Sequence, residues 1–157
     1  MEKQKKKVDI YITHNVRIGV RTKQGAYGYM LTFQKQNGEL EKRTGYGMTG
    51  EITQNSIILT ALEDALSRLT MPCDLTVYMD SIYISNMYRK SQLDSWYLRD
   101  FCHVRTGKIQ DADKWKRIEE LSRMHDIQSE YYTHHEYTDD LKKEIEQMVE
   151  RGEKNAG

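Results

Sequence analysis

Residues near the start of the chain alternate between apolar and polar side chains, which predicts strands. Apolar residues occupy every second position over residues 8–13, and successive side chains of a strand point to opposite faces. The alternation returns over residues 16–34, and again over 39–47 after the turn pair Asn37 and Gly38. We therefore expect an antiparallel meander of three strands.

Helical periodicity begins at Asn55. Apolar residues recur there at intervals of three and four positions, which places them on one helix face: Ile58, Leu62, Ala65, Leu66 and Leu69. The helix is predicted to end before Pro72, which lacks an N–H group and disfavours helical dihedrals in the preceding residue. A short strand over residues 75–80 follows and ends in Asp80.

The second half of the chain predicts further helices. One is expected from Ser81 to about Lys90. Another follows the polar residues Asp111 and Asp113, either of which can cap it, and carries Trp115 on its apolar side. We interpret Trp115 as a core anchor.

A fifth strand is predicted over residues 127–133. The last helix is predicted to open at Thr138 with acidic residues in its first turn, and Gly152 is well placed to end it. The expected fold class is α/β, with a five-stranded mixed sheet in which the first three strands are antiparallel.

The length and charge of the chain limit the interpretation. With 157 residues it is long enough for one domain with its own core, and we assign that domain to residues 8–151 between a basic tail over 1–7 and a tail over 152–157. Basic and acidic residues both number 24, so net charge gives no argument for a nucleic-acid partner.

No apolar run suits a signal peptide or a membrane span, and we expect a cytoplasmic protein. Cys73 and Cys102 are expected to be reduced thiols.

One segment between residues 88 and 108 is locally basic. Its cations are interleaved with aromatic residues such as Trp96 and Tyr97, and they are Arg89, Lys90, Arg99, Arg105 and Lys108. Such a pattern suits phosphate contact and base stacking on a nucleic acid. It also suits a solvated pair of helices, and both interpretations stay open.

Asp80 is the residue on which the functional interpretation depends. An acid at the carboxyl end of a strand, just before a helix, stands where open α/β sheets place their ligands. The alternative is that Asp80 is only the N-cap of the helix that follows.

The order of these elements and several short motifs resemble the ribonuclease HI and wider RNase H-like family, over about Val8 to Val149. The segment GAYGYML at residues 25–31 is similar to the family's glycine-rich second strand, and Thr53-Gln54-Asn55 is similar to the motif that opens its first helix. Later motifs also match in order and spacing, namely Asp111 to Trp115, Glu130 to Tyr132 with His135, and Asp139 to Leu141.

The resemblance implies cleavage of the RNA strand of RNA–DNA hybrids by two divalent ions held by four acids. In this chain the first-strand position falls on Thr13 and the first-helix position on Ile58, neither of which offers a carboxylate. Asp80 and Asp139, or its neighbour Asp140, remain. Since Mg²⁺ needs oxygen ligands and dehydrates reluctantly, we expect at most one weakly held Mg²⁺ or Mn²⁺ ion, at Asp80 and Asp139.

Histidines offer a way to repair such a site. His135 follows the last strand and is the better candidate for a catalytic role beside Asp80 and Asp139, whereas His14 at the end of the first strand is more often a hydrogen-bonding residue. An active but rearranged ribonuclease H is therefore one alternative.

The favoured function is binding of nucleic acid, an RNA–DNA hybrid or a duplex, with cleavage absent or strongly impaired. The residues expected to contact it are Asn15, Gln54 and Asn55 at the strand-to-helix junctions, together with the five cations between residues 89 and 108. A protein-interaction module that keeps only the fold is the second alternative.

Overall fold

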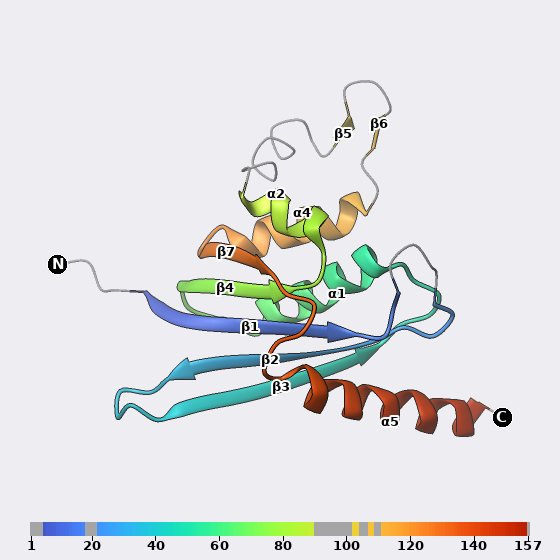
Figure 1. The fold of residues 1–157 in the computed structure, drawn as a ribbon. Coiled ribbons are helices and arrows are strands. Elements are labelled where there is room, and N and C mark those ends of the chain that lie inside the picture. The colour runs from blue at the N-terminus through green and yellow to red at the C-terminus, as the bar shows by residue number, and fades with distance from the viewer. Residues whose placement is uncertain (1–4, 18–21, 90–101, 104–106, 109–110, 157) are drawn as a thin grey trace.

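The structure is a computed structural model, which describes residues 5–17, 22–89, 102–103, 107–108 and 111–156. Within these residues a five-stranded sheet has the order β3-β2-β1-β4-β7 (Figure 1). Its strands are β1 (Lys6–His14), β2 (Ala26–Gln34), β3 (Leu40–Met48), β4 (Cys73–Met79) and β7 (Asp126–Tyr131). A separate two-stranded sheet pairs β5 (Cys102–His103) with β6 (Gly107–Lys108).

The sheet is mixed, as the sequence predicted. β1 pairs with β2 and β2 with β3 in antiparallel register, whereas β4 lies parallel to both β1 and β7. The predicted meander and fifth strand are therefore confirmed, although β7 ends at Tyr131 rather than Thr133. Part of the alternation over residues 16–23 lies outside the described residues, and Thr22 forms only an isolated bridge with Ile52.

Helices cover both faces of the sheet (Figure 1). The helices α1 (Gln54–Ser67), α2 (Ile82–Arg89) and α4 (Ala112–Ser122) lie on one side, and α5 (Thr138–Ala156) lies on the other. No helix among these described segments is long and apolar enough to cross a membrane.

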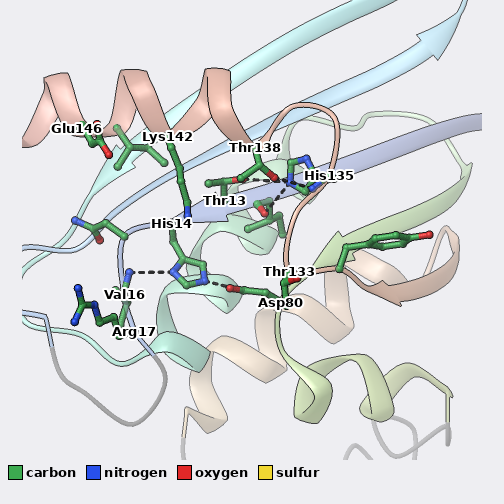
Figure 2. A pocket seen from close by; sticks show the side chains of 14 residues that line it. Thr13, His14, Val16, Arg17, Asp80, Thr133, His135, Thr138, Lys142 and Glu146 are labelled. Carbon is green, nitrogen blue, oxygen red and sulfur yellow. Dashed lines mark hydrogen bonds and ion pairs between the residues drawn. The ribbon is translucent and has the colours of Figure 1, made fainter.

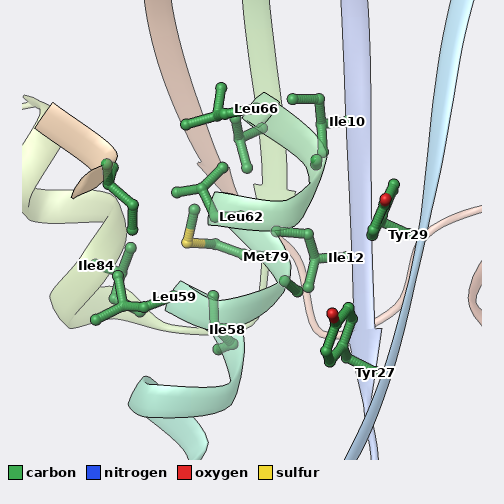
Figure 3. Close-up of a cluster of buried hydrophobic side chains, with 14 of the residues drawn as sticks. Ile10, Ile12, Tyr27, Tyr29, Ile58, Leu59, Leu62, Leu66, Met79 and Ile84 are labelled. Atoms are coloured by element: carbon green, nitrogen blue, oxygen red, sulfur yellow. The ribbon is translucent and has the colours of Figure 1, made fainter. Parts of the chain in front are cut away.

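The larger core lies between the sheet and α1 (Figure 3). Thr53 caps α1 by accepting a hydrogen bond from the Ser56 N–H group, and the predicted apolar stripe packs on residues of β1 and β4 that include Ile12 and Met79. Ile58 is 0 % exposed within this core. The position that resemblance assigned to a catalytic acid is therefore a closed, apolar one.

The start of α4 differs in detail from the prediction. Asp111 is the N-cap residue, with a left-handed φ of 59°, but its side chain makes no capping hydrogen bond. Its carboxylate accepts the Ser56 hydroxyl at 2.7 Å instead and so links α4 to α1. Trp115 is 1 % exposed in the core, as expected for an anchor.

The predicted end of the last helix at Gly152 is wrong, because α5 continues to Ala156. A Cβ atom at Gly152 would lie 3.0 Å from Gln24 Nε2 and 3.2 Å from Met48 Cε. Glycine at this position allows the helix to approach the sheet closely. Tertiary packing therefore outweighs the tendency of glycine to end a helix.

Candidate functional site

A cavity of about 360 Å³ opens where the ends of β1 and β4 meet α5. Figure 2 shows that its side chains come from β1 and the residues after it, from the end of β4, from the segment before α5 and from α5 itself. The polar and charged residues in its wall include Thr13, His14, Asn15, Arg17, Asp80, Thr133, His135, Thr138, Lys142 and Glu146. It contains the carboxyl ends of two parallel strands, where the sequence predicted a ligand.

Asp80 lies in this cavity and is bound by His14. His14 Nε2 is 2.7 Å from Asp80 Oδ1, and His14 Nδ1 is 3.0 Å from the Val16 backbone nitrogen, whose N–H donates to it. Since Nδ1 accepts, the proton of the neutral ring is on Nε2, which donates to the carboxylate. His14 therefore holds Asp80 in place and uses both of its ring nitrogens to do so.

The alternative interpretation of Asp80 as a helix cap is wrong. Ser81 caps α2, because its Oγ accepts the Ile84 N–H at 3.2 Å. The Asp80 main-chain carbonyl in turn accepts Gln54 Nε2 at 3.0 Å. Burial alone would raise the pKa of Asp80, but the hydrogen bonds to it, chiefly from His14, outweigh burial and lower the pKa below its ordinary value. Asp80 is thus a carboxylate at neutral pH.

Thr13 and His135 face each other beside this pair. Thr13 Oγ1 is 3.1 Å from His135 Nε2, which also lies 3.2 Å from the Ile12 carbonyl oxygen. The Tyr137 N–H donates to His135 Nδ1 at 3.2 Å, so the neutral ring carries its proton on Nε2. Burial lowers the pKa of His135, which keeps it in this neutral form.

Both histidines have the lone pair of their Nδ1 atom engaged by the main chain. A general base needs a lone pair directed at the proton it takes, and a metal ligand needs one directed at the ion. In both rings the unprotonated Nδ1 accepts a main-chain N–H group. These hydrogen bonds hold both imidazole rings in fixed orientations beside Asp80 and Thr13.

The last of the predicted acids lies elsewhere. The Asp139 side chain is 85 % exposed and pairs with His134 Nε2 at 3.0 Å, outside the cavity. The first residue of α5, Thr138, lines the cavity in its place, and its Oγ1 accepts the His135 N–H at 2.9 Å. Asp139 is therefore not among the described residues that line the cavity with Asp80.

The residues present do not fit a two-ion centre. Among the described residues no group of three histidine, cysteine, aspartate or glutamate side chains is arranged to hold a metal ion. Among the described residues that line the cavity, Glu146 on α5 is the one carboxylate besides Asp80. Hard divalent cations require several oxygen ligands at once, and this wall does not supply them.

Two of the three junction residues predicted to contact nucleic acid bind the protein's own main chain. Asn15 Oδ1 accepts the Ala26 N–H and its Nδ2 donates to the Gln24 carbonyl, while Gln54 donates to Asp80. The third, Asn55, accepts the Ser81 hydroxyl at 2.9 Å. The side chains of Arg89, Lys90, Arg99, Arg105 and Lys108 lie outside the described residues.

Sequence reasoning missed Arg17, Lys142 and Glu146. The last two follow Thr138 at intervals of four residues, so they share a helix face with it. This spacing was visible in the sequence. It gained meaning only once Thr138, rather than Asp139, was seen to face the cavity.

A comparison with protein families gives a match to the RNase H family over residues 17–151. The chain belongs to the RNase H family. Ribonuclease H of Clostridium botulinum (strain Hall) is 29 % identical over 123 residues, which cover 78 % of this chain and 79 % of that protein. Ribonuclease H of Lachnoclostridium phytofermentans is 30 % identical over 121 residues, 77 % of this chain and 76 % of that one.

Solved structures confirm the RNase H fold. LC9-RNase H1, described as a type 1 RNase H with the type 2 active-site motif, superposes with a TM-score of 0.72 at 14 % identity, covering 94 % of this chain and 72 % of that one. The RNase H domain of PFV gives a TM-score of 0.65 at 20 % identity and covers 92 % of both chains. The expected RNase H-like architecture is thereby established.

Proposed function

We propose that this member of the RNase H family binds nucleic acid, an RNA–DNA hybrid or a duplex, and does not hydrolyse it by the metal-dependent route. One observation carries the proposal. Of the predicted catalytic and metal-holding acids, Asp80 alone lines the cavity, and its carboxylate is engaged by a histidine that is itself fixed by the main chain.

The chemistry of two-ion hydrolysis supports this conclusion. Such a site needs carboxylates that bring two cations a few ångströms apart, one to activate water and both to stabilise the charge that develops. Thr13 is hydrogen-bonded to a neutral imidazole, and Ile58 is enclosed by apolar side chains. Neither position supplies negative charge, so the cations lack their ligands.

The binding part of the proposal is supported by the relatives. A foamy viral protease-reverse transcriptase in complex with an RNA/DNA hybrid superposes with a TM-score of 0.69 at 16 % identity, and this chain covers 20 % of it. A further structure of that protein is a complex with double-stranded DNA. A shared fold makes a nucleic-acid duplex the first partner to test.

The test has a cleavage arm and a binding arm. Labelled RNA–DNA hybrid is incubated with the protein in Mg²⁺ and in Mn²⁺, beside Asp80→Asn and Asp139→Asn variants, and we expect no cleavage by any of them. Hybrid, duplex RNA and duplex DNA are then titrated at several salt concentrations. A specific complex should weaken linearly on a log–log plot as salt rises, because bound phosphates displace counterions.

Two outcomes would contradict the proposal. Turnover by the unmodified protein that Asp80→Asn abolishes would establish an active ribonuclease H with a rearranged site. No binding to any of the three nucleic acids would leave a protein-interaction module that keeps the RNase H fold.

A further inference from the structure

Two cationic side chains reach the cavity from different elements. Arg17 follows β1, and Lys142 lies on α5 one turn beyond Thr138. Figure 2 shows Lys142 extending from the helix toward His14, with Arg17 on the side of that ring away from Asp80. The cavity thus contains fixed positive charge at the site where the family's chemistry requires cations.

Neither cation is neutralised by an acid within the described part of the chain. Ion pairs there involve other basic residues, for example Arg68 with Asp64 and Arg123 with Glu119, and none includes Arg17 or Lys142. Glu146 stands four residues after Lys142, a spacing that favours pairing, yet the two form no ion pair. Both cations are therefore available to an anion.

The two described acids of the cavity, Asp80 and Glu146, form no ion pair with Arg17 or Lys142. Asp80 Oδ1 already accepts the His14 N–H, and in Figure 2 the imidazole lies between Asp80 and Arg17, while Lys142 reaches toward the ring from α5. Glu146 lies one turn further along α5 and is exposed. An anion can contact the two cations with the His14 ring between it and Asp80.

We propose, on the basis of the function proposed above, that this cavity binds a nucleic-acid phosphate directly through Lys142 and Arg17, with no metal ion between them. The two side chains supply as fixed protein charge what a divalent ion supplies in a two-ion site. Lysine and arginine are the usual partners of phosphate oxygens. The volume of about 360 Å³ is many times the roughly 30 Å³ that one water occupies, so it admits a phosphate and part of its hydration.

A neighbouring hollow provides the contrast. It holds about 410 Å³ and is lined by Tyr11, Tyr78, Tyr132, His134, His135 and Glu136. Among the described residues that line it there is no lysine or arginine, and Glu136 contributes an acid. This hollow therefore offers a phosphate no cationic side chain, in contrast to the cavity that holds Lys142 and Arg17.

The proposal is tested by measuring hybrid binding to the full chain in EDTA, as a function of salt, for Lys142→Gln and for the matched control Lys143→Gln. Lys143 is exposed on the same helix and does not line the cavity. Loss of one phosphate contact should weaken binding several-fold and reduce the log–log salt slope by about 1. We expect this of Lys142→Gln and of Arg17→Gln, a larger loss in the double variant, and no change in Lys143→Gln.

The outcomes separate this inference from the proposed function. If the unmodified protein binds hybrid but Lys142→Gln and Lys143→Gln behave alike, the phosphate site is wrong and the nucleic-acid-binding function stands. If the unmodified protein binds only when Mg²⁺ is added, direct contact is also wrong, because an ion is then needed between protein and phosphate. If no nucleic acid binds, both proposals fail together.

Discussion

His14 Nε2 donates a hydrogen bond of 2.7 Å to Asp80 Oδ1 and thereby joins the ends of two parallel strands. His14 is 6 % exposed, so its two hydrogen bonds are shielded from water. The Val16 N–H is buried with the ring, whereas the Asp80 side chain is 33 % exposed to the cavity. The hydrogen-bonded pair therefore stabilises the folded protein and also fixes the position of the Asp80 carboxylate in the cavity.

Substitutions of His14 should show how much each of its two hydrogen bonds contributes to the stability of the protein. Alanine leaves a partly buried carboxylate and the Val16 N–H without partners, and we expect the free energy of unfolding to fall by about 3 kcal/mol. Glutamine keeps a donor near the Nε2 position, and asparagine keeps an acceptor near Nδ1. Each should recover about half of the loss in urea denaturation. Full recovery by glutamine alone would mean that the Val16 contact contributes nothing.

Stability should fall as the pH drops below about 6.5. Burial lowers the pKa of both His135 and His125, so below the ordinary histidine value the unfolded chain takes up protons that the folded protein resists. The slope should be at most about 1.4 kcal/mol per pH unit for each ring. The pKa of Asp80 is lowered, so its loss of charge affects only more acidic solutions.

Urea unfolding between pH 8 and pH 5 checks this dependence. His125→Asn is the matched variant, because the asparagine oxygen can accept the Cys73 N–H that His125 Nδ1 accepts at 3.0 Å, while the titrating ring is removed. Its stability should vary less with pH than that of the unmodified protein. An identical pH profile would show that His125 is not responsible.

An acidic side chain at position 58 should greatly reduce the stability of the folded protein. Ile58 is 0 % exposed, and a glutamate there would be buried without a charged partner, so we expect Ile58→Glu to lose more than about 4 kcal/mol. Ile82 is 60 % exposed in the first turn of α2, where a negative charge is favourable. Ile82→Glu is therefore the control and should change the urea midpoint little. A folded Ile58→Glu protein of normal stability would show that this helix face opens to solvent.

Two neighbouring tyrosines of β2 should respond differently to loss of the hydroxyl group. Tyr27 donates to Asp64 Oδ2 at 3.0 Å, and Tyr27→Phe should cost about 1 kcal/mol. The Tyr29 hydroxyl is buried with no hydrogen-bond partner in the described residues, and burial raises its pKa to about 12. Tyr29→Phe should leave stability unchanged or increase it. Thermal and urea unfolding of both variants test the contrast, which an equal loss in the two would contradict.

The sequence predicted the sheet because its signals are local and strong. Alternation over residues 8–13 and the apolar stripe after Asn55 identify strand and helix, and Pro72 separates the helix from the next strand. Gly152 misled the prediction because its effect depends on Gln24 and Met48, which are distant in sequence.

The site was less accessible to sequence reasoning. One residue along an α-helix rotates a side chain by about 100°, so assigning the cavity position to Asp139 instead of Thr138 changes an exposed acid into a buried hydroxyl. The contact between His14 and Asp80 spans 66 positions. Its existence depends on the parallel pairing of β1 with β4, which sets residues from the two strand ends side by side.

The hydrogen bonds around His135 have a consequence for how this cavity varies between related chains. Its ring and main chain contact Ile12, Thr13, Tyr137 and Thr138 from two separate elements. A carboxylate placed at position 13 alone would meet a neutral imidazole that already donates to a main-chain carbonyl. The residues at positions 13, 135 and 138 therefore depend on one another. They should covary among related proteins, and a design that introduces a different active site into this fold should replace all three together.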